Sequence, residues 1–535
     1  MQNQRRSSAE DDPGDANPMD SASWTGKTAC ALQAALQMSN EVFARHLGIG
    51  VRTVADWHKK PDTKPQSGMQ QLLEAALDRA TPAARARFEQ LTTGRTPEPD
   101  DAEQRLADDP NISAALDWLD HHASWEPGNA RRRVATRLAQ LDLHALRDAA
   151  SRRSRVDQRR VADALAEYYG ARTQPHGRYT AVYGGRDEAV TSVLTCPEWL
   201  DLDCPLVARS DRLSVVPASA DVDITLDEEA AMHAVQRLAG TLAMGIRLID
   251  TPLYRLLGID VHKGEVAGSV GITNFVAYAV TMDLLENELT DALADGIAPR
   301  PGSLPLRDRY LPDLAAVLDV SRRLCAGGAL ALCAIARPAS PYRGEADYVL
   351  LVQERSGRVL NAAHRLAVIP KGFHEPMTDV RADAQIGATL RREMEEELFG
   401  RDDTDSTTTD WLRADPMHPS RLSEPMRWLM DTPGRLRMEC TGFGLNMVSG
   451  NFEFAGLIVI EDEEFWTRYG GLIEANWESA SLRQYSSLDP QLLTELIGDV
   501  AWSNEGLFAL LQGLRRLSQI GGDRVNLPAI DWKVQ

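Results

Sequence analysis

The sequence contains few cysteines, and they follow no pattern that binds zinc or builds a disulfide framework. There are six in 535 residues, without a CxxC pair and without a histidine at the spacing of zinc ligands. We therefore expect six buried thiols. They are Cys30, Cys196, Cys204, Cys325, Cys333 and Cys440.

Long apolar runs are also missing. A transmembrane helix needs roughly 18 apolar residues, whereas the longest candidate, Gly328–Ile335, has only the length of a strand. The first residues, Met1–Ser23, are polar and acidic and contain no apolar core of a secretory signal. These absences predict a cytoplasmic protein that does not enter a membrane.

Positive charge is scarce over the whole chain, whose formal net charge is −20. Binding to phosphate groups needs a local excess of cations, so a nucleic-acid interface spread over the whole surface is excluded. Any contact with DNA must be confined to one segment of the chain.

The composition is that of a folded protein, with 43% hydrophobic and 25% charged residues. A chain of 535 residues is too long for one core and predicts about three to four domains. The Pro-rich and acidic stretch Thr92–Asp101 has the composition of a linker and marks a domain boundary. Helical spacing follows it, and strand-like segments begin near Tyr179. After Pro490 the spacing is helical again, and five leucines predict a buried stripe: Leu507, Leu510, Leu511, Leu514 and Leu517.

The segment Asn40–Lys60 has the spacing of a helix-turn-helix. Ala44 is small enough to let two helices cross closely, Gly48 can take the positive φ of a tight turn, and Val54 fills the crossing point. Ser39 is placed to cap the first helix. The alternative is a helical bundle whose small residues only allow close packing.

These residues resemble the Xre-type, phage-repressor-like helix-turn-helix family. The resemblance implies that the second helix reads base edges while nearby cations hold phosphates. Residues 27–88 carry nine cationic and five anionic side chains, so their net charge of +4 opposes the charge of the whole chain. Such modules usually read two half-sites, which implies a homodimer on double-stranded DNA. The predicted DNA-binding residues are Arg52, Thr53, Lys59, Lys60 and Lys64.

A second motif lies in Ile369–Gly400, where the residues REMEEE at Arg392–Glu397 match the pattern REUxEE, with U a bulky aliphatic residue. In an α-helix Glu393, Glu396 and Glu397 share one face, and three crowded carboxylates suit Mg²⁺ or Mn²⁺. The pattern resembles the Nudix box, which implies a metal site on these glutamates and nucleoside diphosphate derivatives as substrates. The alternative is an exposed acidic helix face.

The match to the Nudix box is incomplete. Ala384 stands where the family has a glutamate, Thr378 stands where it has a glycine, and the closing glycine is one residue late, at Gly400. The stretch Pro370–Arg392 is also longer than in the family, and Glu375 is a candidate to replace the missing carboxylate. Efficient hydrolysis needs a base and a shaped phosphate loop, so the sequence favours ligand sensing over turnover.

The expected fold class is multidomain: an all-α helix-turn-helix domain, a helical and α/β middle region, and a C-terminal Nudix-like α/β/α sandwich. The predicted boundaries are 1–24 for a disordered leader, 25–93 for the helix-turn-helix domain, 94–104 for a linker, 105–170 for a helical segment, 171–325 for a middle α/β domain, 326–485 for the Nudix-like domain and 486–535 for a C-terminal helical segment.

The sequence leaves three functions open. The first is a transcriptional regulator whose body binds a phosphorylated or nucleotide-like ligand and thereby alters DNA binding. The second is a Nudix hydrolase with an accessory DNA-binding domain, and the third is a protein-interaction scaffold. As a whole, the chain resembles a group of actinobacterial helix-turn-helix regulators with a Nudix-like C-terminal domain. The incomplete Nudix box favours the first function.

Overall fold

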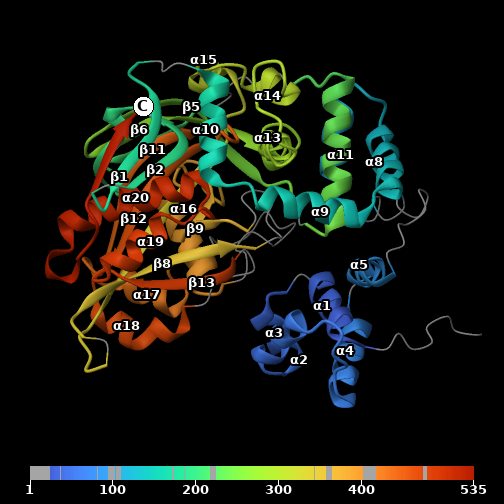
Figure 1. The fold of residues 1–535 in the computed structure, drawn as a ribbon, viewed down its shortest axis with the longest axis horizontal. Helices are drawn as coiled ribbons and strands as arrows, with labels where there is room; N and C mark the ends of the chain where they lie inside the picture. Colours follow the sequence, from blue (N-terminus) through green and yellow to red (C-terminus); the bar gives the residue numbers. More distant parts are fainter. Residues whose placement is uncertain are drawn as a thin grey trace, which may run out of the picture. The chain divides into compact units, whose positions relative to one another are not determined.

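The computed structural model describes residues 24–93 without 37 and 81, residues 103 and 106, and residues 110–170, 174–216 without 186, 224–342 without 247, 344–356, 364–401, 417–473 and 479–535. The chain divides into two compact units, Met1–Arg95 and Thr96–Gln535. We call them the N-terminal unit and the body (Figure 1).

The N-terminal unit contains five helices in its described residues. Thr25 and Thr28 cap the first helix reciprocally, and the Ser39 hydroxyl caps the second by accepting a hydrogen bond from the Val42 amide at 3.2 Å. The helices are α1 (Gly26–Ala35), α2 (Asn40–Leu47), α3 (Val51–Lys59), α4 (Ser67–Asp78) and α5 (Pro82–Thr93).

The body begins with helices and continues as a mixture of helices and strands. Its described α-helices are α7 (Pro110–His122), α8 (Asn129–Gln140), α9 (Leu143–Ser154), α10 (Gln158–Tyr169), α11 (Glu228–Met244), α12 (Phe275–Ala279), α13 (Leu284–Ala294), α14 (Pro305–Tyr310), α15 (Leu314–Leu318), α16 (Ile386–Glu393), α17 (Glu424–Asp431), α18 (Glu463–Tyr469), α19 (Pro490–Ile497) and α20 (Asn504–Ile520).

Two sheets organise the described residues of the body. An 11-stranded mixed sheet has the order β13-β8-β7-β12-β11-β2-β1-β14, with β10 paired to β7, β3 to β11 and β9 to β8, and a 3-stranded sheet has the order β4-β6-β5. The strands are β1 (Gly177–Tyr183), β2 (Asp187–Thr195), β3 (Leu200–Pro205), β4 (Asp211–Val215), β5 (Pro252–His262), β6 (Glu265–Asn274), β7 (Gly327–Arg337), β8 (Asp347–Arg355), β9 (Leu366–Val368), β10 (Lys371–Phe373), β11 (Leu436–Asn446), β12 (Phe452–Ile460), β13 (Ser479–Ser486) and β14 (Ile530–Val534).

The large sheet is covered on both faces. Along β7, Ala331, Cys333 and Ile335 belong to one core, whereas Leu330 and Leu332 belong to the other, as expected when side chains alternate along a strand. Because neither face is left to solvent, the central strands are continuously apolar.

Helix α20 packs against the face of this sheet that carries Leu330 and Leu332 (Figure 1). The leucine stripe predicted for this helix is confirmed, because all its members are buried against the sheet. The stripe consists of Leu507, Leu510, Leu511, Leu514 and Leu517.

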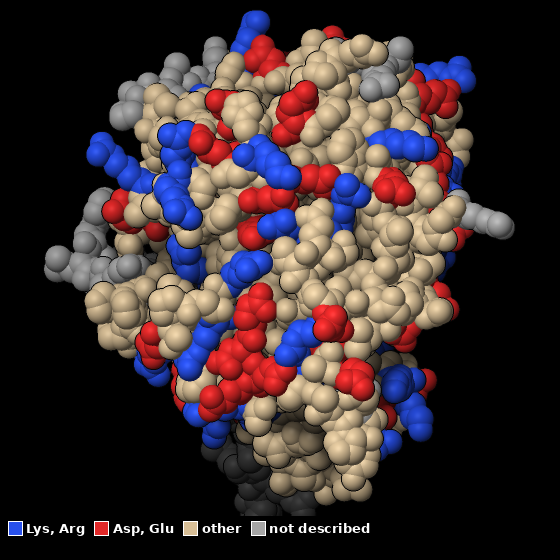
Figure 2. All heavy atoms as spheres, turned by 90° about the vertical axis from the view of Figure 1, so that its left-hand side faces the viewer, with Lys and Arg blue, Asp and Glu red and all other residues tan. Residues whose placement is uncertain are grey.

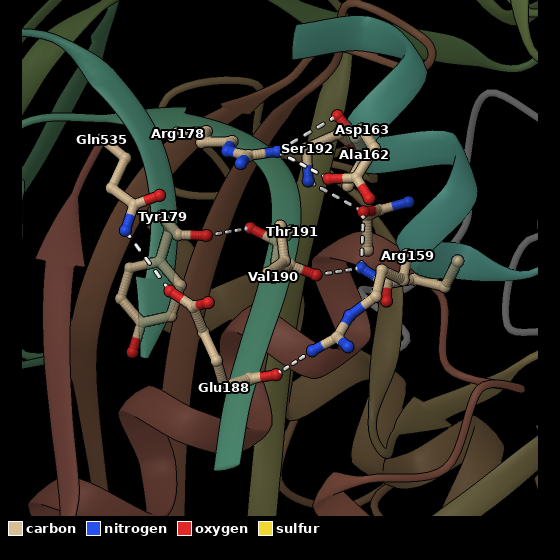
Figure 3. A network of polar contacts seen from close by, with 12 residues as sticks. Arg159, Ala162, Asp163, Arg178, Tyr179, Glu188, Val190, Thr191, Ser192 and Gln535 are labelled. Atoms are coloured by element: carbon tan, nitrogen blue, oxygen red, sulfur yellow. Dashed lines mark hydrogen bonds and ion pairs between the residues drawn. The ribbon is translucent and has the colours of Figure 1, made fainter. Parts of the chain in front are cut away.

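A polar junction ties α10, β2 and α20 together (Figure 3). The Asn504 side-chain oxygen, at the start of α20, accepts hydrogen bonds from the Gln158 side chain at 2.9 Å and from the Ser192 amide at 2.8 Å. Arg178 on β1 forms an ion pair with Asp163 on α10 at 3.2 Å. Segments hundreds of positions apart are therefore parts of one structure.

The predicted fold class is wrong. The prediction was a helical and α/β middle region followed by a separate sandwich. Instead, one sheet joins β1–β3 from the predicted middle region to β7–β14 from the rest of the chain. The last strand, within a segment predicted to be helical, pairs with β1, with Tyr179 opposite Val534. The body is therefore one unit built on a mixed sheet, and not a middle region followed by a separate sandwich. Pairing between distant strands leaves no local periodicity, so the sequence patterns could not show it.

Two simpler expectations concern membranes and thiols. No helix in the described part of the chain is both long enough and apolar enough to cross a bilayer. All six cysteines are free thiols, Cys30 being partly buried and the other five buried.

Candidate functional site

The contact between α2 and α3 is built from the residues that the turn pattern singles out. Ala44 and Val54 are 1% and 0% exposed, and Gly48 has a φ of 68°, in the left-handed region. Phe43 and Trp57 are also buried in this small core. The local predictions for Ala44, Gly48 and Val54 are therefore confirmed.

The predicted DNA-binding side chains lie on the outside of the same unit. Arg52, Lys59, Lys60 and Lys64 are exposed, and Thr53 is half-buried. At a helical rise of about 1.5 Å per residue, Arg52 and Lys60 are about 12 Å apart along the axis of α3. The structure thus separates the two groups, with Arg52 at the beginning of α3 and the lysines at and beyond its end.

Gln33 is a residue that the sequence interpretation missed. It is 3% exposed, and its amide donates to the Asn40 side chain at 2.8 Å and to the Met38 carbonyl at 3.1 Å. Its oxygen accepts from Nε2 of His58 at 2.9 Å. Gln33 therefore ties the end of α1 to the start of α2 and the end of α3. A polar residue on the apolar face of the first helix is the signal that could have revealed it.

The glutamates of the second motif are buried, so they are not an exposed acidic face. Glu393 and Glu396 are 6% and 7% exposed, and Glu397 is fully buried. Helix α16 ends at Glu393 and continues as a π-helical turn, Met394–Leu398. The wider turn changes the angular spacing on which the predicted common face of the three carboxylates depends.

Two of these carboxylates are engaged by the protein itself. Glu397 accepts a hydrogen bond from the Lys371 amide at 2.7 Å, and Glu393 lies 2.8 Å from the Arg392 guanidinium. A Cβ atom on Gly372 would lie 1.9 Å from the Glu393 carboxylate, so only glycine leaves room for it. In the described residues, no group of three or more His, Cys, Asp or Glu side chains could hold a metal ion. The predicted Mg²⁺ or Mn²⁺ site stays a prediction, and any metal ion there would compete with these contacts for the carboxylates.

The segment that contains Thr378 and Ala384, where the sequence departs from the Nudix pattern, forms a loop around Asp383. The Asp383 carboxylate accepts hydrogen bonds from the amides of Met377, Thr378 and Asp379 at 2.8–3.1 Å. Glu375, the candidate replacement carboxylate, lies 3.8 Å from the Arg392 guanidinium. The loop is therefore folded around an internal carboxylate.

His374 fixes the other side of this loop. Its Nε2 donates to the Ala384 carbonyl at 3.1 Å, and its Nδ1 accepts from the Thr389 hydroxyl at 2.7 Å. Burial lowers the pKa of His374 to about 3, so the ring is neutral at physiological pH. Its contacts give it a role in holding the loop.

A buried charge cluster lies between the sheet and the start of α20, and the sequence interpretation missed it. The Lys371 ammonium is 2.5 Å from one Glu505 oxygen, and the Asn446 amide donates to the other oxygen at 3.1 Å. Lys371 holds the pKa of Glu505 below its usual value although burial acts in the opposite direction. Burial, and then the charge of Glu505, raise the pKa of Glu453 to about 8.

The charges on the body surface are mixed. On the face drawn in Figure 2, acidic side chains gather in the lower half and are bordered by lysine and arginine. Several arginines of the body are committed to ion pairs, such as Arg516 with Glu439 at 2.6 Å and Arg515 with Asp201 at 2.8 Å. That face offers no broad cationic surface to a phosphate backbone.

The sequence matches no protein-family model and no curated protein with which it was compared. The resemblances to the Xre-type and Nudix families therefore depend on the motif residues alone.

Proposed function

We propose that this protein is a sequence-specific DNA-binding transcriptional regulator in which α3 reads the major groove. The supporting observation is the placement of exposed Arg52 at the beginning of α3 and of exposed Lys60 directly after its end, which an ideal helical rise puts at about 12 Å along the axis. The major groove of B-DNA is about 12 Å wide, so Arg52 could face base edges while Lys60 faces a phosphate strand. The net charge of +4 over residues 27–88 adds the local cationic density that such binding needs.

The assignment of roles to Arg52 and Lys60 can be tested by comparing two duplexes. A genome-wide map of bound DNA would supply the specific sequence, and a scrambled duplex serves as reference. Arg52→Ala should weaken specific binding by about 1–3 kcal/mol and leave the scrambled duplex nearly unaffected. Lys60→Ala should weaken binding to both duplexes similarly.

Arg79→Ala is the matched control, because Arg79 is an exposed cation at the end of α4. It should leave binding to both duplexes close to wild type. Absence of shared sequence elements in the genome-wide map would refute sequence-specific regulation. Equal losses for Arg52→Ala on both duplexes would reduce Arg52 to a phosphate contact.

The sensing part of the proposal concerns the body. We propose that a phosphorylated or nucleotide-like ligand binds at the half-buried strand β10, which borders Glu393 and Glu397. Phe373 packs edge-on against Phe275, with ring centroids 5.6 Å apart. This strand therefore carries an aromatic side chain next to the residues that contact Glu393 and Glu397. Glu375 and Glu393 contact the Arg392 guanidinium, and Glu397 accepts from the Lys371 amide. These contacts favour binding over hydrolysis, because a carboxylate that is already held by a cation or an N–H donor is a weaker general base.

Ligand binding can be measured by its effect on stability and on DNA affinity. At a ligand concentration of about 100 times Kd, a ligand that binds only the folded protein stabilises it by about 2.7 kcal/mol. Inorganic phosphate, a nucleoside diphosphate and a nucleotide sugar are suitable probes. One of them should raise the melting temperature of the body and change DNA affinity. Stabilisation with unchanged DNA affinity would contradict the regulatory role.

A further inference from the structure

A short loop follows α3 and carries two of the predicted phosphate contacts. This lysine loop consists of residues 60–65 and contains Lys60 and Lys64, both exposed. Its far end is anchored to α4, because the Gln70 side chain donates to the Pro65 carbonyl at 2.7 Å. The two lysines therefore extend from a backbone that is held in place.

The first turn of α1 holds the middle of the lysine loop. The Gly26 amide donates to the Thr63 carbonyl at 2.8 Å, and the Lys27 amide donates to the Pro61 carbonyl at 2.7 Å. Amides in the first turn of a helix have no partner within the helix. Here they bind the loop, so the start of α1 sets where the lysine loop lies.

This close approach requires glycine at position 26. A Cβ atom there would lie 2.8 Å from the Lys60 carbonyl oxygen, 3.1 Å from that of Trp57 and 3.2 Å from that of Pro61. All three neighbours are backbone atoms and cannot rotate away. Any side chain at position 26 must therefore push the loop or the end of α3 outward.

We infer that the first turn of α1 belongs to the DNA interface: Gly26 positions the lysine loop against α3, and Lys27 adds a further phosphate contact. The inference rests on the proposed function. The Lys27 side chain is exposed, and its backbone is bonded directly to the loop. A double-stranded DNA backbone is the partner that this geometry favours, because the loop continues from the end of α3.

The local charge supports an anionic partner. Lys27, Lys59, Lys60 and Lys64 are exposed around the loop, and the nearby acidic side chains are Asp56 and Asp62. Four cations against two anions leave an excess of positive charge on a small part of the surface. Each phosphate that such a cation neutralises adds about 0.9 to the slope of log affinity against log salt concentration.

The positioning role is tested in the full chain with Gly26→Ala. Alanine is a better helix former than glycine, so a loss of binding cannot come from weaker helix propensity. The salt slope should fall by about 2, because Lys60 and Lys64 are displaced together. The ratio of specific to scrambled affinity should stay within about twofold, because Arg52 is at the other end of α3.

Gly68→Ala is the matched control for this experiment. Gly68 also lies in the first turn of a helix, α4, and a Cβ atom there would meet nothing within 4 Å. This variant should keep the wild-type salt slope. An unchanged slope in Gly26→Ala would overturn the positioning role.

Lys27 is tested separately, since its side chain is exposed and its loss leaves the fold intact. Lys27→Gln should reduce the salt slope by about 1 on specific and scrambled duplexes alike, whereas Arg79→Gln should not. If the wild type binds DNA and Arg52→Ala loses selectivity, but Lys27→Gln and Gly26→Ala keep the wild-type slope, the inference fails and the proposed function stands. If the wild type does not bind DNA, both fail.

Discussion

The N-terminal unit and the body are built from contacts of very different range along the chain. The core of the N-terminal unit extends from Trp24 to Ala76 and joins helices that follow one another. In the body, β1 pairs with β14, the last strand, with Tyr179 opposite Val534. The first unit can therefore form from local elements, whereas the large sheet is complete only when the end of the chain is in place.

The two units also differ in charge. Residues 27–88 are net +4 within a chain of −20, so the remaining residues are net −24. In the N-terminal unit the predicted contact cations are exposed, whereas arginines of the body such as Arg516 lie in ion pairs. An anionic partner is therefore attracted to one small part of this protein and repelled by the net charge of the rest.

The largest expected effect tests whether the two units unfold independently. Phe508 is fully buried on α20 and packs edge-on against Tyr179, with ring centroids 4.9 Å apart. Phe508→Ala should destabilise the body by about 3–5 kcal/mol, because it leaves a cavity between helix and sheet. Hydrogen exchange during urea unfolding should show faster opening of the body and unchanged opening of α1–α4.

Tyr342→Ala is the control for Phe508→Ala, because Tyr342 is 98% exposed and its removal should change neither unit. Equal destabilisation of both units by Phe508→Ala would show that they unfold together.

A second prediction concerns pH and sharpens the electrostatic difference. The pKa of Glu453 is raised from 4.5 to about 8, so the folded body holds a proton that the unfolded chain releases. This contribution to stability is fully present below pH 4.5 and is lost as the pH rises through about 8. The free energy of unfolding of the body should therefore decrease between pH 5 and pH 8.

Glu453→Gln should remove most of this decrease, because the amide does not titrate. Urea unfolding of wild type and variant at several pH values measures the difference. The opening of the N-terminal unit should not depend on this substitution at any pH. A variant with the full pH dependence of the wild type would show that another group is responsible.

The smallest expected effect concerns the backbone of the turn between α2 and α3. Gly48 has a φ of 68°, and a Cβ atom there would meet nothing within 4 Å. Gly48→Ala should therefore destabilise the N-terminal unit by about 1 kcal/mol through backbone strain alone, and Gly48→Asn should cost less.

Gly50→Ala is the matched control for Gly48→Ala, since Gly50 has a φ of −73° and a Cβ atom there would come no closer than 3.9 Å to Thr53. Thermal melting followed by exchange of the α2 and α3 amides measures both variants. Equal destabilisation by the two substitutions would show that the left-handed turn is not what requires glycine.

Several local features of this protein could be predicted from the sequence. Small and branched residues at fixed spacing identified the contact between α2 and α3, through Ala44, Gly48 and Val54. The leucine spacing of α20 identified its buried stripe. These predictions succeeded because a helix repeats every 3.6 residues, so burial of one face leaves a periodic pattern within a short segment.

The candidate sites were predicted less completely. The sequence identified Arg52 and the lysines beyond α3 as a surface, and the structure finds them exposed or half-buried. It missed Gln33 and the first turn of α1, whose contacts join residues from different helices. It also placed Glu393 and Glu397 on a common helical face, without the π-helical turn and the partners that occupy them.

The sequence by itself determined the helices whose buried face repeats every 3.6 residues and the turn that requires glycine at position 48. Only the tertiary structure decided that β1 pairs with β14, that Lys371 meets Glu505, and that the motif glutamates are buried. The physical reason is the range of the interactions. Helix periodicity and turn geometry act between near neighbours, whereas strand pairing and buried ion pairs join residues that meet only when the whole body has folded.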